Sequence, residues 1–173
     1  TRGSLTADVG ARYSHFRVSA GDATFGALEL SSGSWVGHGG ATYRVTPAFQ
    51  VFGAISQAFR APNVDDVSTL GLFDSGIEVP SVDLVPERTW SVEAGVRMRV
   101  GPVAATVTAF RTNLRDLIDR VRSTYLGSAF YEGQPVYQKA NVQQAYVHGA
   151  ELEGHWQATD RLIVFGHASY AFG

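Results

Sequence analysis

The stretch Thr89–Val100, TWSVEAGVRMRV, decides the fold class of this chain because its polarity alternates residue by residue. Apolar residues occupy every second position: Trp90, Val92, Ala94, Val96, Met98 and Val100. The positions between them carry Thr, Ser, Glu, Gly and Arg. A period of two predicts a β-strand with one apolar and one polar face. In a soluble sandwich the apolar face lies inside, whereas in a membrane-spanning barrel it faces lipid.

The composition narrows the class of protein. The chain has 173 residues, of which 45% are hydrophobic and 17% charged, as in a folded protein. It contains no cysteine, which excludes disulfides and thiolate metal sites, and its net charge of −2 gives no indication of a nucleic-acid partner. No apolar run reaches the roughly 18 residues of a transmembrane helix. The chain starts without Met and ends inside an alternating pattern, so we expect an excerpt of a longer protein.

The alternating pattern recurs along the whole chain. It predicts seven strands: four at about 5–18, 33–45, 49–59 and 89–100, a fifth that starts at 103, and two more at about 138–157 and 162–172. Short turns separate some of them, at 46–48, 101–102 and 158–161, and long polar stretches separate the others, at about 19–32, 60–86 and 121–136. Short and long connections therefore alternate. In an up-and-down antiparallel sheet this order places all long loops at one end, as in outer-membrane β-barrels.

Aromatic residues at the predicted strand ends favour the membrane interpretation. Trp35 and Trp90 lie near the long-loop end of their strands, and Trp156 and Tyr43 lie near the short-turn end, all on the apolar face. In membrane-spanning barrels, belts of aromatic residues, called aromatic girdles, lie at the two membrane interfaces. From Trp90 to Val100 a strand tilted by about 40° spans a height of about 25 Å, the height of the apolar band of such barrels. We therefore expect the apolar face to contact lipid; a soluble all-β ligand-binding module is the alternative.

Four sequence motifs resemble those of a known family. They are QAFRAPNVDDV at 57–67, SVDLVPERTWSVEAGV at 81–96, TAFRTNLRDLIDRV at 108–121 and YQKANVQQAYVHGAELEGHWQATDRL at 137–162. In this order and spacing they are similar to the barrel motifs of the TonB-dependent outer-membrane receptors. The resemblance implies a 22-stranded transmembrane barrel, of which residues 1–173 form about seven strands, with a plug domain outside this chain.

The resemblance also implies a function and a location. Members import a scarce nutrient, such as a ferric siderophore, across the bacterial outer membrane with energy supplied by TonB. The expected partners are outer-membrane lipid, the plug domain of the same protein, the TonB complex and a small nutrient ligand. A porin, an adhesin or another barrel without TonB coupling remains an alternative. No catalytic motif appears, so we expect no enzymatic activity.

The long loops carry the candidate ligand contacts. These candidates are Arg60, Asp65, Asp66, Asp74, Tyr125 and Tyr131. The loop 61–86 contains five acidic residues and no Lys or Arg, so it could bind Ca²⁺ or admit a cationic or neutral ligand. A solvated acidic loop is the simpler alternative. Tyr125 and Tyr131 could stack on an aromatic or sugar-like ligand, or pack their loop against its neighbours.

The polar face of the strands carries the candidate lumen contacts. Arg97, Arg99, Glu151 and Glu153 lie near the short-turn end, with Glu93 further along the same face. Thr106 and Thr108 are expected between the arginines and the glutamates, at a separation of about 10 Å across two strand spacings. These charges could form a network in the lumen, hold the plug, or line a solvated wall.

No resident metal is expected. The five histidines are scattered and show no ligand spacing: His15, His38, His148, His155 and His167. The resemblance adds one observation, because haem receptors of the family tend to carry a histidine in the loop that corresponds to 60–87. This chain has none there, which disfavours haem as the ligand.

Overall fold

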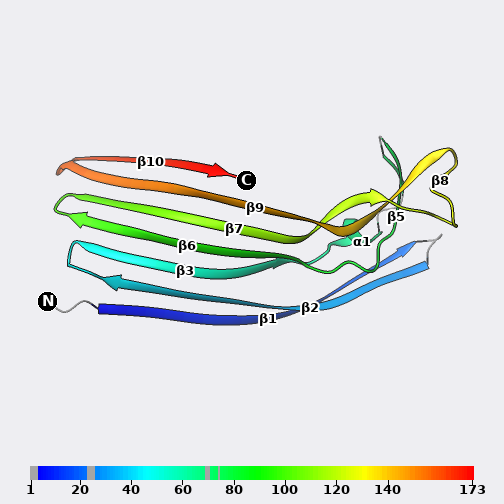
Figure 1. Ribbon diagram of the computed structural model, residues 1–173, viewed down its shortest axis with the longest axis horizontal. Coiled ribbons are helices and arrows are strands. Elements are labelled where there is room, and N and C mark those ends of the chain that lie inside the picture. The colour runs from blue at the N-terminus through cyan, green and yellow to red at the C-terminus, as the bar shows by residue number, and fades with distance from the viewer. Residues whose placement is uncertain (1–3, 23–25, 69–70, 74) are drawn as a thin grey trace.

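The computed structural model describes residues 4–22, 26–68, 71–73 and 75–173, and its main feature is one curved, largely antiparallel sheet (Figure 1). Its seven long strands follow each other in chain order, and each is antiparallel to the next. They are β1 (Ser4–Asp22), β2 (Gly26–Arg44), β3 (Phe49–Arg60), β6 (Glu87–Val100), β7 (Val103–Arg122), β9 (Gln134–Thr159) and β10 (Leu162–Phe172). The predicted all-β, up-and-down architecture is confirmed.

The connections are sorted between the two ends of the sheet. Figure 1 shows the turns β2–β3, β6–β7 and β9–β10 at one end and the longer connections at the other. The connection between β3 and β6 contains α1 (Val64–Ser68), β4 (Gly71–Phe73) and β5 (Gly76–Val79), and that between β7 and β9 contains β8 (Phe130–Tyr131). Among the described residues, no helix is long and apolar enough to cross a membrane.

The apolar face of the sheet is open to its surroundings. Val92, Val96, Leu152 and Val164 are 48%, 43%, 49% and 48% exposed, respectively. The few buried apolar residues of the described chain lie instead at the long-loop end: Leu30, Val67, Ile77, Val79, Leu84 and Val136. A soluble sandwich would bury the first set, so this distribution supports the barrel wall and argues against the soluble module. The sheet is open: β1 forms one edge, and beyond β9 the other side is formed by β10 and, at the long-loop end, by β5 and β4.

Two of the predicted long loops are wrong at their boundaries. Strands β1 and β2 stay paired through 19–22 and 26–32, up to the pair Asp22 and Gly26, and residues 23–25 fall outside the described residues. Likewise, β7 continues to Arg122 and β9 begins at Gln134. Beyond the hydrocarbon an outward side chain no longer has to be apolar, so the alternation disappears although the backbone ladder continues.

Two glycines of the sequence motifs have a packing role. A Cβ on Gly95 would lie 2.3 Å from the Val107 carbonyl oxygen and 2.6 Å from Cζ of Phe52, its cross-strand partner. A Cβ on Gly149 would similarly meet its partner Phe110 at 3.0 Å. In both pairs an aromatic ring from one strand covers a glycine on the next, an arrangement that shields the glycine backbone and fixes strand register.

We predict that Gly95→Ala destabilises the full-length barrel, whereas Gly39→Ala does not. The added methyl at Gly95 must displace backbone or the Phe52 ring, which costs about 1–3 kcal/mol. At Gly39 the nearest atom to a Cβ, the Asp8 carbonyl oxygen, is 3.7 Å away, an ordinary contact. The measurement is the temperature at which the folded band in gel electrophoresis converts to the unfolded one. Equal temperatures for the two variants would contradict the packing role.

Candidate functional site

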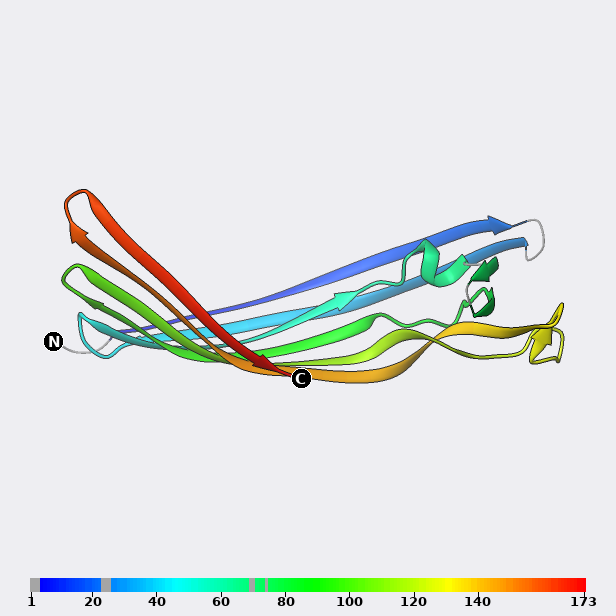
Figure 2. The same cartoon turned by 90° about the horizontal axis from the view of Figure 1, so that it is seen from above.

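The connection between β3 and β6 folds back onto one face of the sheet at the long-loop end. We call the face that this loop covers the inner face. It is the polar face of the sheet, opposite the apolar face, and it carries Glu93, Arg97 and Arg99. Figure 2 shows α1 between the β1–β2 hairpin and β9, and β5 pairs in parallel with β9 through Ile77 and Val136. The loop is therefore attached to both sides of the curved wall.

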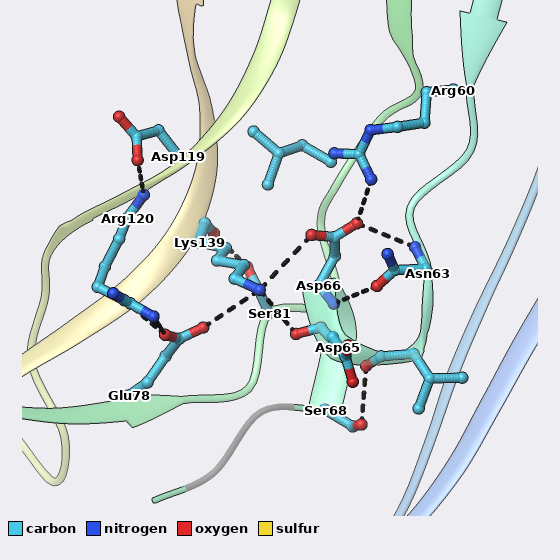
Figure 3. Close-up of polar contacts among 12 residues, drawn as sticks. Arg60, Asn63, Asp65, Asp66, Ser68, Glu78, Ser81, Asp119, Arg120 and Lys139 are labelled. Atoms are coloured by element: carbon cyan, nitrogen blue, oxygen red, sulfur yellow. Dashed lines mark hydrogen bonds and ion pairs between the residues drawn. The ribbon is translucent and has the colours of Figure 1, made fainter. Parts of the chain in front are cut away.

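Helix α1 begins at a reciprocal cap. Asn63 Oδ1 accepts a hydrogen bond from the Asp66 amide at 2.8 Å, and Asp66 Oδ2 accepts one from the Asn63 amide at 3.0 Å. This is a capping box with an Asp at its third helical position. The negative charge in the first turn also complements the helix dipole. The cap orients the Asp66 carboxylate toward the sheet (Figure 3).

Arg60, the last residue of β3, joins three elements. Its Nε and Nη2 each donate to one carboxylate oxygen of Glu87 on β6 at 2.7 Å, and its Nη1 donates to Asp66 Oδ2 at 2.7 Å. Glu87 Oε1 also accepts a hydrogen bond from the Ile118 amide of β7 at 2.9 Å. This forked geometry is the strong, specific form of an arginine–carboxylate pair.

Lys139 on β9 holds the other side of the loop. Its Nζ donates to the Asp65 carbonyl oxygen at 2.9 Å and lies 3.5 Å from Asp66 Oδ1 and 3.6 Å from Glu78 Oε1. Glu78 of β5 is only 1% exposed, and its other oxygen accepts from Arg120 Nε on β7 at 2.5 Å. A buried carboxylate needs such compensation, because desolvation without a partner costs several kcal/mol.

Together these side chains form what we call the ion-pair chain, in which charges of opposite sign alternate. In order, its members are Glu87, Arg60, Asp66, Lys139, Glu78 and Arg120. They come from six different elements: β6, β3, α1, β9, β5 and β7. The ion-pair chain therefore connects four wall strands to α1 and β5 of the loop, and its formal charges cancel.

Apolar packing and backbone contacts support the same attachment. Leu30 of β2, Val67 of α1 and Leu84 of the loop form a small buried cluster against Val18 and Ile118. The Ser81 amide donates to the Val67 carbonyl oxygen at 2.9 Å. Further along the loop, the Asn141 side chain accepts from the Val85 amide and donates to the Val85 carbonyl oxygen, both at 2.9 Å. These contacts make the loop an ordered part of the inner face.

The ion-pair chain shifts three pKa values. For Asp66, burial acts to raise the pKa, but the Asn63 amide, Arg60 and Lys139 together hold it below its ordinary value. For Glu87, the hydrogen bond from Arg60 is the main reason that the pKa is lowered, and it outweighs burial. The pKa of Arg60 is raised, chiefly by its hydrogen bond to Glu87. All three groups are therefore stabilised in their charged forms.

The predicted ligand contacts on the loop lie in this attachment. The side chains of Arg60 and Asp66 are bonded to each other and to the wall, and Asp65 contributes its backbone oxygen to Lys139. Asp74 falls outside the described residues. Within the described ranges, no group of three or more His, Cys, Asp or Glu residues is arranged to hold a metal ion. The cations that neutralise this acidic loop come from neighbouring strands.

The predicted tyrosines lie near the tip of the connection between β7 and β9. The rings of Tyr125 and Tyr131 meet edge to face, with centroids 5.2 Å apart at an angle of 83°. The guanidinium of Arg122, the last residue of β7, lies 4.8 Å from the ring centroid of Tyr137 and 5.9 Å from that of Phe130. Tyr131 and Phe130 are exposed. The tip thus presents aromatic rings and a cation, which suit stacking on a flat or anionic ligand.

The charged residues near the short-turn end share the inner face. Arg97 is opposite Thr106, which is opposite Glu153, and Glu151 is opposite Thr108 one step further along. The Arg97 guanidinium lies over the Phe52 ring at 4.2 Å. No ion pair of the described residues joins Arg97 or Arg99 to Glu151 or Glu153. An open cavity of about 710 Å³ lies over this region, lined in part by Arg44, Arg97, Arg99, Glu153 and His167.

Sequence reasoning did not find Lys139, Glu78 and Arg120 as one unit. From the sequence, Glu78 is only one of the five acidic residues of the loop 61–86. Lys139 is the only lysine of the chain, and it lies near the start of the predicted strand 138–157, which the structure extends back to Gln134. That isolated lysine, opposite an acidic loop without cations of its own, was the available signal.

The sequence matches a protein-family model, and the fold matches solved structures. A family model described as TonB dependent receptor-like, beta-barrel, matches residues 2–172. Comparison with curated proteins finds no match. Many solved structures share the fold, and three represent them below.

The three structures come from different bacteria. The FrpB iron transporter of Neisseria meningitidis (F3-3 variant) is 19% identical with a TM-score of 0.68, and the match covers 96% of this chain and 23% of that one. The siderophore receptor PirA of Pseudomonas aeruginosa is 20% identical with a TM-score of 0.65, covering 96% and 34%. The hemophore receptor HasR of Serratia marcescens, in complex with HasA and heme, is 15% identical with a TM-score of 0.69, covering 99% and 31%. The chain thus spans about a quarter to a third of these proteins.

We predict that acid releases the loop from the wall. Because the pKa values of Asp66 and Glu87 are lowered in the folded state, their contribution is fully present above their ordinary values of 3.8 and 4.5. It is lost as the pH falls through the lower folded values. Hydrogen exchange of 61–86, corrected for intrinsic rates, should be constant between about pH 7 and about pH 5 and rise below about pH 4. A rise between about pH 7 and about pH 5 would contradict this assignment.

We also predict that Lys139→Met loosens the loop, with a local opening free energy lower by about 1–3 kcal/mol. Methionine keeps the length of the side chain but leaves Asp66 and buried Glu78 with one cation fewer. Arg17→Met is the matched control, because Arg17 and its partner Glu29 are 65% and 55% exposed. Hydrogen exchange of 61–86 should rise in the first variant only. Equal exchange in both variants would contradict the role of Lys139.

Proposed function

The chain belongs to the TonB-dependent receptor-like β-barrel family, and we propose that it is part of an outer-membrane receptor that takes up a scarce nutrient, such as a ferric siderophore, with energy supplied through TonB. The match over residues 2–172 carries this proposal. It also argues against the porin and adhesin alternatives. The three solved structures are an iron transporter, a siderophore receptor and a hemophore receptor, and relatives of this kind are receptors and transporters rather than enzymes.

The polarity of the sheet supports a position in the outer membrane. Exposed Trp35 and Trp90 lie toward the long-loop end and exposed Trp156 toward the short-turn end, with apolar residues between these levels. This arrangement fits two membrane interfaces. The long loops then face outward, where a nutrient is met, and the short turns face the periplasm.

The tip of the connection between β7 and β9 is the favoured ligand contact of this chain. Tyr125 and Tyr131 present rings there, and Arg122 supplies a cation. In contrast, Arg60 and Asp66 are engaged in the ion-pair chain, so their favoured role is to hold the loop that borders the ligand entrance. Ca²⁺ binding by the acidic loop stays a prediction.

The inner face near the short turns is the favoured contact for the plug. Arg97, Arg99 and Glu153 line an open cavity on the face away from lipid, and Glu151 lies on the same face of the sheet. Mixed charges without ion pairs to each other suit a partner that must be held and later moved, because exposed pairs contribute little each. In the complete receptor, the TonB complex would act on this plug.

The experiment uses the full-length protein in a strain that lacks it, grown under iron limitation. Uptake of radiolabelled iron is measured with ferric siderophores of different chemistry, with and without TonB. We expect saturable, TonB-dependent uptake of at least one complex. Tyr131→Ala should weaken apparent affinity about two- to tenfold through the lost ring contact.

Tyr43→Ala is the matched control, because Tyr43 is on the apolar face near the short-turn end. It should leave the apparent affinity unchanged. Uptake that is equal with and without TonB would overturn the proposed function. Unchanged affinity in Tyr131→Ala would remove only the role of the loop tip.

A further inference from the structure

Two arginines stand directly opposite each other on the lipid-facing side of the sheet. Arg88 of β6 and Arg115 of β7 are cross-strand partners. They share their face with Trp90 and Asn113, the next partners on that side. Cross-strand partners have Cβ atoms only about 5 Å apart, so like charges here are destabilising unless an anion lies between them.

A third arginine, Arg111, extends toward Arg88 and Arg115 from the short-turn side. Arg111 of β7 is opposite Val92 and His148, both on the apolar face. Its guanidinium stacks over the Tyr146 ring at 5.1 Å, and its Nε donates to Asn113 Oδ1 at 3.3 Å. Asn113 lies one step closer to the loops. Arg111 therefore extends along the strand toward Arg115, as long cationic side chains do near a membrane interface.

In the described part of the chain, no carboxylate forms an ion pair with these three arginines. All three are exposed. This contrasts with Arg60 and Arg120 on the inner face, which are paired with carboxylates. The strand register also leaves Arg115 open toward β9, because the pairing between β7 and β9 breaks between Leu114 and Leu117. An irregularity of this kind locally bends and opens the ladder.

The level of the cluster identifies its partner. Trp90 and Tyr146 both pair with or flank Asn113, and both are exposed on the apolar face. Rings of this type lie at the level of lipid head groups. Arg88 and Arg115 are one pleat further out, about 5 Å along the membrane normal for a tilted strand. The guanidinium groups therefore lie beside head groups, and planar guanidinium groups bind phosphate through paired hydrogen bonds.

We propose that Arg88, Arg111 and Arg115 form a binding site for the phosphorylated head group of a lipid in the outer leaflet. The inference rests on the proposed placement in the outer membrane, with long loops outward. The head-group phosphate lies between Arg88 and Arg115 and relieves their repulsion, and Arg111 reaches it from the hydrocarbon side. The acyl chains cover the apolar face below Trp90. The site fixes this part of the wall at a defined depth in the leaflet.

The test uses the full-length receptor, purified from outer membranes and reconstituted in two kinds of vesicle. One is phosphatidylcholine alone, and the other is phosphatidylcholine with diphosphorylated lipid A. The temperature of unfolding is measured in each. We expect lipid A to raise it for the native protein, and dephosphorylated lipid A to have no such effect. In Arg88→Gln/Arg111→Gln/Arg115→Gln the rise should disappear, with lipid A affinity lower by about tenfold per arginine.

The matched control removes the same charge from the other face. Arg12→Gln/Arg44→Gln/Arg97→Gln changes three arginines of the inner face and should keep the lipid-dependent rise. Arg88→Gln alone serves if the triple variant does not fold, and it should reduce the rise. Equal rises in native and Arg88→Gln proteins would overturn the site. An equal rise with inorganic phosphate would also overturn it, since the anion would then need no lipid.

This outcome is separate from that of the proposed function, because no transport is measured. Loss of TonB-dependent uptake with a retained lipid effect would remove the proposed function alone. Retained uptake without a lipid effect would remove the lipid site alone.

Discussion

The need to pair every backbone N–H and C=O group inside hydrocarbon governs this structure. No water is present there to satisfy an unpaired group, and each one would cost several kcal/mol. Long antiparallel ladders meet this need, and they run without interruption along most strand pairs. The side chains are then divided strictly between two faces. The face that contacts lipid carries apolar residues such as Val92 and Leu152. The opposite face can carry charged residues such as Arg97 and Glu153.

Outside the hydrocarbon layer, water rather than lipid surrounds the structure, so different interactions stabilise it. The loop between β3 and β6 cannot rely on lipid to exclude water, so it needs its own packing. A small cluster around Val67 and an ion-pair chain of alternating sign provide it. The paired charges matter chiefly because Glu78 is buried: with Arg120 and Lys139 in place its desolvation is offset, and without them the loop strand β5 would carry an unpaired charge.

Local sequence patterns predict the strands of the barrel wall well, but they do not predict the contacts that attach the loop to it. Alternation identified the lipid face, since Trp90, Val92 and Val96 obey one periodic rule that needs no knowledge of distant residues. The same rule placed Thr106 between Arg97 and Glu153. It failed at 19–32 and 121–136, where strands continue after their apolar requirement ends. Partners such as Lys139 and Glu78 are 61 positions apart and meet through a parallel pairing. The sequence shows a single lysine and an acidic loop, but nothing in it indicates that the two come into contact.

The aromatic rings that cover Gly95 and Gly149 affect the shape of the lumen. Phe52 and Phe110 lie against the wall where a neighbouring side chain would otherwise project. A plug in contact with this part of the wall would meet aromatic rings and, over Phe52, the Arg97 guanidinium 4.2 Å from the ring centroid.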